Sequence, residues 1–425
     1  MRRDEGRSVR AARLSRADRG ATRRTRRDYN PHVGARIVTI SRRGVDRLRG
    51  GHPWIYRSDI VDAEAEPGDL VRVVSERKRP LGIAFWSSQS QISLRMLGPE
   101  TELPDERELI GARLRASIAY RQTLDIDATA YRLVNAEADR LPGLIVDCYG
   151  EGEDSCLVIQ TLSQGIDRRQ ALVAELLAEL TGARGILARN DVRVRALEGL
   201  DERVEVVHGE VPERVTIREG RITYDVDPRG GQKTGLFLDQ RENHQAAVRY
   251  ARGRALDAFT YAGGFALPMA QVCDRVLAID SSAAAVAATS ENARRNGLTN
   301  VETREANVFD ELRELEIARE RFDTIVLDPP AFARNKASVE RAAAGYNEIN
   351  LRALKLLAPG GYLITCSCSY NVNEALFQTI LESAAADSRA TVALVEKRMQ
   401  SRDHPVLLNV PETHYLKCLI LRRLD

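Results

Sequence analysis

Two cysteines stand one residue apart in the segment ITCSCSY, residues 364–370. A thiol pair at this spacing has four interpretations: a metal site, half of a disulfide, core packing or a nucleophile. Neither Cys366 nor Cys368 has a companion CxxC or HxxxH pair, which argues against a structural zinc site. The chain's six cysteines are scattered over 425 residues, which argues against a disulfide framework and favours a reducing cytoplasm. On composition alone, packing is favoured over the nucleophile.

One reaction that requires a nucleophilic thiol is methylation at carbon 5 of a pyrimidine, because that carbon is not nucleophilic in the aromatic ring. A thiolate that adds at C6 converts the base to an enamine-like species that can attack a methyl sulfonium. Such a thiol needs a lowered pKa and an exposed position, as at the end of a strand. The apolar run before Cys366 and Cys368 predicts a strand that ends there, the fifth of a sheet.

Asp328-Pro329-Pro330 follows the apolar run FDTIVL, which predicts the fourth strand of the same sheet. The two prolines stiffen the exit from the strand and fix the Asp328 carboxylate at its end. A carboxylate held there can accept hydrogen bonds from the edge of a base or from a cofactor.

The segment FTYAGGF, residues 259–265, lacks the GxGxxG pattern of dinucleotide-binding proteins. Its glycines still allow a close backbone approach to a ligand. Asp280 ends the next predicted strand, where a carboxylate suits both hydroxyls of a ribose, and Asn307 follows the third strand, near an adenine edge. Without a pyrophosphate cradle, a nucleoside such as S-adenosylmethionine fits better than NAD. The candidate cofactor-binding residues are Phe259, Tyr261, Gly263, Gly264, Asp280, Ser281, Asn307, Asp328 and Pro329.

The elements that position these residues belong to the last of three segments. Short alternating runs over 36–104 predict a small β-barrel or sandwich. Helices and strands alternate over 105–212, which predicts a central α+β domain. A hairpin (215–227) opens the third segment, 213–425, in which strand, turn and helix repeat. This repeated order of elements predicts an α/β fold with a mostly parallel, doubly wound sheet.

The chain has an uneven charge. Residues 1–28 hold eleven arginines and four acidic residues, a net charge of +7, and the rest of the chain is near −5. We expect residues 1–35 to form a disordered basic arm, either a phosphate-binding segment or a solvated tail. The sequence contains no run of about 18 apolar residues, so it does not predict a membrane span.

Aromatic residues near the start could stack on RNA bases. The segment HPWIYR carries Trp54 and Tyr56 beside His52 and Arg57. The simpler expectation, which we favour, is that Trp54 and Tyr56 face the core of the small β-domain.

Several segments together resemble a family of bacterial 5-methylcytosine methyltransferases whose type member modifies large-subunit ribosomal RNA. They are KTGLFLDQREN, FTYAGGFA, VLDPPAFARNK, APGGYLITCSCS and ETHYLKCLILRR. The resemblance covers nearly all of residues 36–425. It implies a class I methyltransferase fold of seven strands, a PUA-like RNA-binding domain over 36–104 and a target cytosine flipped out of its stack. Ribosomal RNA is thus the implied partner, and a homodimer is a candidate assembly.

The resemblance also assigns roles to residues. The family's Ser-Cys-Ser falls on 367–369, so Cys368 is the implied nucleophile and Asp328 the group that orients the base. FLDQREN is similar to the cofactor segment of related uracil methyltransferases, which implicates Gln240 and extends to Arg241. Two departures are visible: Asn307 replaces an aspartate, and Pro330-Ala331 stands where many RNA enzymes have a second cysteine that helps release the product.

Three rival functions differ in what they require. A guanine N-methyltransferase shares the sheet and the DPP motif, with Phe332 nearby, but needs no thiol. An RNA-binding protein with an inactive methyltransferase-like domain would not need Asp280, Asp328 and Cys368 together. An NAD-dependent oxidoreductase lacks its phosphate loop here.

Overall fold

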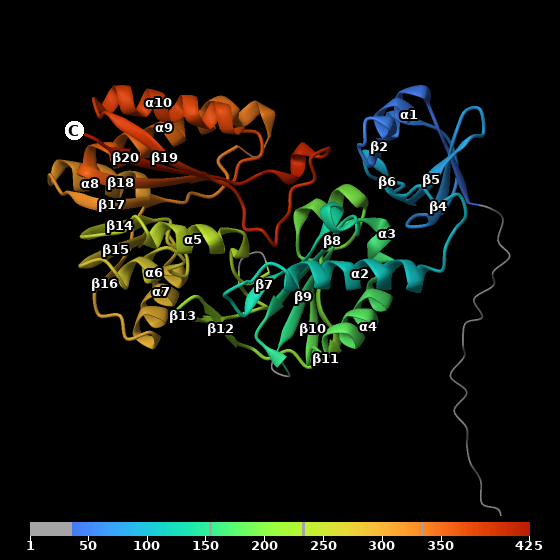
Figure 1. The fold of residues 1–425 in the computed structure, drawn as a ribbon, viewed down its shortest axis with the longest axis horizontal. Helices are drawn as coiled ribbons and strands as arrows, with labels where there is room; N and C mark the ends of the chain where they lie inside the picture. Colours follow the sequence, from blue (N-terminus) through green and yellow to red (C-terminus); the bar gives the residue numbers. More distant parts are fainter. Residues whose placement is uncertain (1–35, 153–154, 232–233, 334) are drawn as a thin grey trace, which may run out of the picture. The chain divides into compact units, whose positions relative to one another are not determined.

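The computed structural model describes residues 36–152, 155–231, 234–333 and 335–425. The expected basic arm lies outside these residues. In this described part of the chain, a six-stranded sheet, a five-stranded sheet, a two-stranded hairpin and a seven-stranded sheet follow one another along the sequence. Figure 1 shows their arrangement. Within the described residues, no helix is both long enough and apolar enough to cross a membrane.

The alternating runs predict a small β-domain, and the first sheet confirms it, with six strands in the order β2-β6-β5-β4-β1-β3. Its strands are β1 (Ile37–Ile40), β2 (Trp54–Tyr56), β3 (Ile60–Glu64), β4 (Leu70–Ser75), β5 (Pro80–Trp86) and β6 (Ile92–Gly98). The helix α1 (Arg42–Arg49) was not expected, because only Gly44 and Val45 in it are buried and so short a face gives no periodicity. Ser41 caps the helix by accepting a hydrogen bond from the amide of Gly44.

The aromatic residues of β2 do not face the core of this sheet, so that expectation is wrong. Successive side chains of a strand point to opposite faces, and it is Ile55 that is fully buried. The Trp54 indole donates to Glu137 Oε1 at 3.0 Å. The Tyr56 ring lies 4.5 Å from the guanidinium carbon of Arg47.

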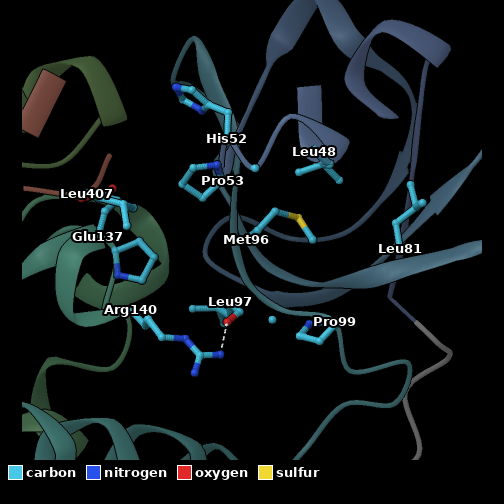
Figure 2. Close-up of a pocket in the computed structure, with 13 residues that line it drawn as sticks. Leu48, His52, Pro53, Leu81, Met96, Leu97, Pro99, Glu137, Arg140 and Leu407 are labelled. Atoms are coloured by element: carbon cyan, nitrogen blue, oxygen red, sulfur yellow. Dashed lines mark hydrogen bonds between the residues drawn. The ribbon is translucent and has the colours of Figure 1, made fainter. Parts of the chain in front are cut away.

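A cavity of about 400 Å³ lies beside β6 and the short helix η2 (Ala136–Asp139) (Figure 2). Figure 2 shows Arg140 donating to the carbonyl of Leu97, a bond of 3.3 Å. The cavity is lined by Leu48, Gly51, His52, Pro53, Leu81, Met96, Leu97, Gly98, Pro99, Glu137, Arg140, Pro142 and Leu407. None of the residues with predicted catalytic or cofactor roles is among them.

The second sheet has five strands in the order β11-β10-β9-β8-β7. Its strands are β7 (Ala130–Asn135), β8 (Leu144–Tyr149), β9 (Cys156–Thr161), β10 (Gly185–Arg189) and β11 (Val204–Gly209). Its helices are α2 (Glu106–Gln122), α3 (Gln164–Asp167) and α4 (Gln170–Thr181). The expected hairpin follows as β12 (Val215–Glu219) and β13 (Ile222–Val226), paired in antiparallel fashion.

The third sheet has seven strands in the order β16-β15-β14-β17-β18-β20-β19. They are β14 (Arg254–Ala258), β15 (Arg275–Asp280), β16 (Val301–Glu305), β17 (Phe322–Leu327), β18 (Leu357–Ser367), β19 (Val392–Arg398) and β20 (Lys417–Arg423). Strands β14 to β18 pair in parallel, and β20 is antiparallel to both of its neighbours. The order reverses between β14 and β17, where a doubly wound sheet binds its ligand.

Helices cover both faces of this sheet (Figure 1). The helices are α5 (Arg241–Val248), α6 (Ala266–Ala270), α7 (Ala283–Arg295), α8 (Val308–Ile317), α9 (Val339–Leu356) and α10 (Glu374–Ser388). Leu256 and Ile325 pack on one face with α8, α9 and α10. The neighbouring residues Ala255 and Val326 pack on the other face with α5 and α6. Helix α7 begins after Ser282, which caps it by accepting a hydrogen bond from the amide of Ala285 at 3.3 Å.

The loop between β19 and β20 joins the second and third sheets through hydrogen bonds to the buried residue Asp403. Asp403 Oδ2 accepts from the amide of Arg132 at 2.9 Å and from Arg241 Nη1 at 2.8 Å. The Asp403 carbonyl accepts from Arg121 Nη2 at 2.7 Å. The loop between β19 and β20 is therefore fixed by residues of α2, β7 and α5 at once.

Candidate active site

The predicted site residues lie where the strands of the third sheet end. Asp280 is the last residue of β15, and Asn307 lies two residues beyond β16. Asp328 directly follows β17, and Cys368 directly follows β18. Because β14 to β18 are parallel, these residues share one edge of the sheet.

The turn after β14 holds a strained backbone against Asp280. Phe259 and Tyr261 have φ values of 69° and 51°, a left-handed conformation that is uncommon for residues other than glycine. The amide of Tyr261 donates to Asp280 Oδ2 at 3.0 Å. At Gly264, a Cβ atom would stand 2.7 Å from the ring of His244, so the close packing of the turn requires glycine there.

Each carboxylate oxygen of Asp280 accepts one hydrogen bond from a backbone amide, which fixes the orientation of the group. Oδ2 accepts from Tyr261, and Oδ1 accepts from the amide of Ser282 at 3.0 Å. Each carboxylate oxygen keeps a second lone pair for a ligand hydroxyl. Ser281 is exposed, and its side chain forms no hydrogen bond with the described part of the chain.

Asn307 caps helix α8. Its Oδ1 accepts from the amides of Phe309 (2.9 Å) and Asp310 (3.4 Å). Its amide group donates no hydrogen bond within the described residues, so it can donate to a base edge.

Asp257, near the end of β14, is a site residue that the sequence analysis missed. Its Oδ2 accepts from Thr260 Oγ1 at 2.7 Å and from the amide of Ala266 at 2.9 Å. Its Oδ1 is buried and has no hydrogen-bond partner within the described residues. Burial raises the pKa of this carboxyl to about 6. The available signal was an aspartate inside the apolar run RALDAF.

Gln240, which is buried, pairs with the half-buried Asp328. Gln240 Nε2 donates to Asp328 Oδ1 at 2.8 Å, while Gln240 Oε1 accepts from Asn243 Nδ2 at 2.6 Å, which fixes the orientation of the amide. Burial raises the pKa of Asp328 to about 7, against the opposing charge of His244. The environment therefore favours the protonated form of Asp328 relative to an exposed aspartate. Arg241 faces away from this pair and bonds Asp403.

The two cysteines of ITCSCSY occupy different environments. Cys366 is fully buried opposite Cys418 of β20, and burial raises the pKa of its thiol well above the usual value. Cys368 is partly exposed, and its thiol donates to the carbonyl of Pro329 at 3.8 Å. The other five cysteines are all buried. The thiol of Cys368 is thus the accessible one, and it lies beside Pro329, the residue that follows Asp328.

A hydroxyl cluster holds the Cys368 loop. The Tyr346 hydroxyl, on α9, lies 3.0 Å from both Ser367 Oγ and Ser369 Oγ. Ser369 Oγ also accepts from the amide of Ala333 at 3.1 Å. The residues on both sides of Cys368 are therefore tied to the segment that follows Asp328.

Comparisons with known proteins agree with this geometry. Residues 161–422 match the model of an S-adenosylmethionine-dependent methyltransferase family, and residues 38–99 match that of a PUA-like domain. Ribosomal RNA large subunit methyltransferase I of Aeromonas salmonicida is 40% identical over 380 residues, 87% of this chain and 95% of that protein. The same enzyme of Aeromonas hydrophila is 39% identical over 404 residues, 92% of this chain and all of that protein. The chain belongs to the S-adenosylmethionine-dependent methyltransferases.

The fold class predicted from the sequence is confirmed for this methyltransferase. A methyltransferase solved in complex with SAH has a TM-score of 0.78 and 21% identity, over 91% of this chain and 99% of the solved one. The PUA-like match falls on the first sheet, and the seven-stranded sheet carries the methyltransferase match.

The site of the methyltransferase fits its cofactor. S-adenosylmethionine supplies a methyl group on a sulfonium, attached to a nucleoside and an amino acid. We propose that Asp280 would hold the ribose hydroxyls and Asn307 the adenine edge. We assign the unpartnered oxygen of Asp257 to the ammonium group, because a buried carboxylate oxygen calls for a donor.

Asp280→Ala is expected to weaken binding of S-adenosylhomocysteine at least tenfold, about 1.4 kcal/mol. The substitution removes both ribose acceptors and the acceptor for the amide of Tyr261. Titration calorimetry of the wild type and the variant measures the change. Asp310→Ala, which removes an exposed carboxylate from α8, is the control and should bind like the wild type. Equal affinity in all three proteins would refute the assignment.

Proposed function

We propose that this methyltransferase forms 5-methylcytosine in large-subunit ribosomal RNA, through a covalent bond between Cys368 and C6 of the target cytosine. The RNA substrate is supported by the names of the relatives, which are ribosomal RNA large subunit methyltransferases. The PUA-like match adds a candidate module for contacting RNA. The choice of cytosine and of carbon 5 is supported by the residues at the strand ends.

The observation that carries this choice is the position of Cys368. Its thiol is partly exposed and lies at the end of the strand next to Asp328-Pro329, with its sulfur 3.8 Å from the Pro329 carbonyl oxygen. A thiol that only fills space would be buried like the other five. A thiolate in this position adds to C6 and makes C5 nucleophilic.

Asp328 is the group proposed to orient and activate the base. With its pKa near 7, the carboxyl can donate a proton to N3 of cytosine, which makes C6 more electrophilic. Gln240 occupies Oδ1 of this carboxyl and so keeps the other oxygen for the base. The target must be flipped out of its stack to reach both Asp328 and Cys368.

We also propose the domain boundaries expected from the sequence: 36–104 for the PUA-like domain, 105–212 for the central domain and 213–425 for the methyltransferase domain. The first two boundaries enclose the six-stranded and five-stranded sheets. The hairpin β12–β13 is included in the third domain, because Asn292 of its helix α7 and Asn296, the residue after it, bond the backbone of β13.

The product of the reaction tests this function. Large-subunit ribosomal RNA from cells that lack the enzyme is incubated with the protein and isotopically labelled S-adenosylmethionine, then digested to nucleosides for mass spectrometry. Labelled 5-methylcytidine is expected, and small-subunit ribosomal RNA serves as the control substrate. Label in methylguanosine would instead favour a nitrogen methyltransferase, which needs no thiol.

A further inference from the structure

Lys417 is a buried lysine beside the Cys368 loop. It begins β20, and only 2% of its surface is exposed. Lysine is almost never fully buried unless its charge has a partner. In the antiparallel pairing of β18 and β20, Lys417 stands opposite Ser367, the residue that precedes Cys368.

The Lys417 ammonium is held by two carbonyl groups. Nζ donates to the Ser369 carbonyl at 2.7 Å and to the Tyr415 carbonyl at 2.8 Å. As an ammonium the group has three protons, and as a neutral amine it has two protons and a lone pair. Within the described residues, no carboxylate lies within ion-pair distance of Nζ. The two bonds thus leave one N–H position for a further partner.

The position of Nζ points to Cys368 as that partner, because Nζ bonds the carbonyl of Ser369, the residue after Cys368, and Lys417 stands opposite Ser367, the residue before it. Burial lowers the pKa of its amine to about 8. The titratable groups that act on it are Cys368, the stronger of the two, and Glu374 at the start of α10; both favour the charged amine. Glu374 is already paired with Lys397 at 2.7 Å. Cys368 itself also faces Tyr346 of α9.

We propose that Lys417 is the positioning residue that keeps Cys368 as a thiolate. The S–H bond of Cys368 breaks and its electron pair stays on sulfur. The proton goes to the neutral amine of Lys417, whose two N–H bonds hold the carbonyls and whose lone pair forms the third N–H bond. The resulting pair has no net charge, so its formation requires no other acid or base. The role of this thiolate as the attacking group rests on the proposed function, whereas the ionisation itself does not.

The pH dependence of thiol alkylation tests the pair without RNA. Iodoacetamide reacts with thiolates, and Cys368 is the one cysteine of the six that is not buried. In Lys417→Met, alkylation of Cys368 at pH 7 should be at least tenfold slower, which corresponds to a thiol pKa higher by one. Lys417→Arg keeps a positive charge and should stay within a few-fold of the wild type. Lys355→Met removes a lysine paired with Glu316 and is the control.

A second measurement uses the wild-type chain and does not depend on whether Lys417→Met folds. Coupling between two titrating groups is reciprocal, so neutral alkylation of Cys368 should lower the pKa of Lys417 by at least one. The chain has six lysines, so NMR of carbon-13-labelled lysine can follow each one, with Lys417 assigned through Lys417→Arg. An unchanged Lys417 titration after alkylation would overturn the proposal. A methylguanosine product would overturn the cytosine-5 function and leave this measurement unaffected.

Discussion

Cys368→Ala is expected to form no detectable 5-methylcytosine, whereas Cys366→Ala should keep most of the wild-type activity. Without the thiolate, C5 of cytosine has no route to becoming nucleophilic. The Cys366 thiol is buried opposite Cys418, and its raised pKa keeps it protonated. Transfer of labelled methyl groups to ribosomal RNA measures both activities.

A trapping experiment separates the two cysteines more sharply. RNA with 5-fluorocytosine at the target should form a stable covalent adduct with the wild type, because fluorine at C5 blocks the elimination that releases the enzyme. The adduct should persist in Cys366→Ala and vanish in Cys368→Ala. Calorimetry with S-adenosylhomocysteine controls for folding, since no contact of Cys368 with the cofactor is proposed. An adduct that survives in Cys368→Ala and is lost in Cys366→Ala would move the nucleophile to Cys366.

Asp328→Asn is expected to lower kcat by two to four orders of magnitude, the usual contribution of general acid catalysis, with little change in RNA affinity. Asparagine keeps an acceptor for Gln240 Nε2 and a donor for the base, but it has no proton to transfer to N3. Single-turnover rates at saturating RNA separate this loss from binding. Gln400→Asn, a substitution of a buried amide on the loop after β19, is a control for general disturbance of the fold. A variant with wild-type kcat would exclude Asp328 as the proton donor.

The same substitution should stabilise the protein, increasingly so as the pH rises. The pKa of Asp328 is about 7 in the folded chain and near 3.8 when exposed. Folding therefore favours the protonated carboxyl, and the wild type loses stability as the pH rises from about 4 to about 7. A pKa that differs by one between the folded and unfolded chains changes stability by about 1.4 kcal/mol, so the gain reaches a few kcal/mol above pH 7 and is small near pH 4. Thermal melts at pH 5 and pH 8 measure it, and a gain that does not grow between them would contradict the assigned titration.

Local patterns were sufficient to predict the elements that carry the site. The strand-turn-helix grammar placed Asp280, Asp328 and Cys368 at strand ends, because a chain that leaves a buried strand needs a turn there. A cap at Ser282 also depends on local sequence alone, since the amide that it accepts from belongs to Ala285, three residues away. Helix α1 was not, because its short buried face leaves no period to detect.

The contacts that tune the site could not be predicted from local sequence. Gln240 and Asp328 are 88 residues apart, and Lys417 meets Ser369 only through the pairing of β18 with β20. The orphaned oxygen of Asp257 depends on the burial of the whole turn. Burial sets the pKa values of Asp328 and Lys417, and burial is a property of the assembled sheet rather than of a segment.

The hydrogen bonds around the buried Asp403 limit how the chain of this methyltransferase can be divided into domains. One loop carboxylate is shared by Arg132 of the second sheet and Arg241 of α5, and the same loop leads to Tyr415 and Lys417. A chimera joined between residues 212 and 213 would take the Arg132 amide from the carboxylate and Arg121 from the Asp403 carbonyl. The carboxylate would keep Arg241 but lose a buried hydrogen bond, at a cost of about 1–3 kcal/mol. Residues 213–425 therefore depend on contacts outside their own sheet, and a chimera that contains them should also contain α2 and β7.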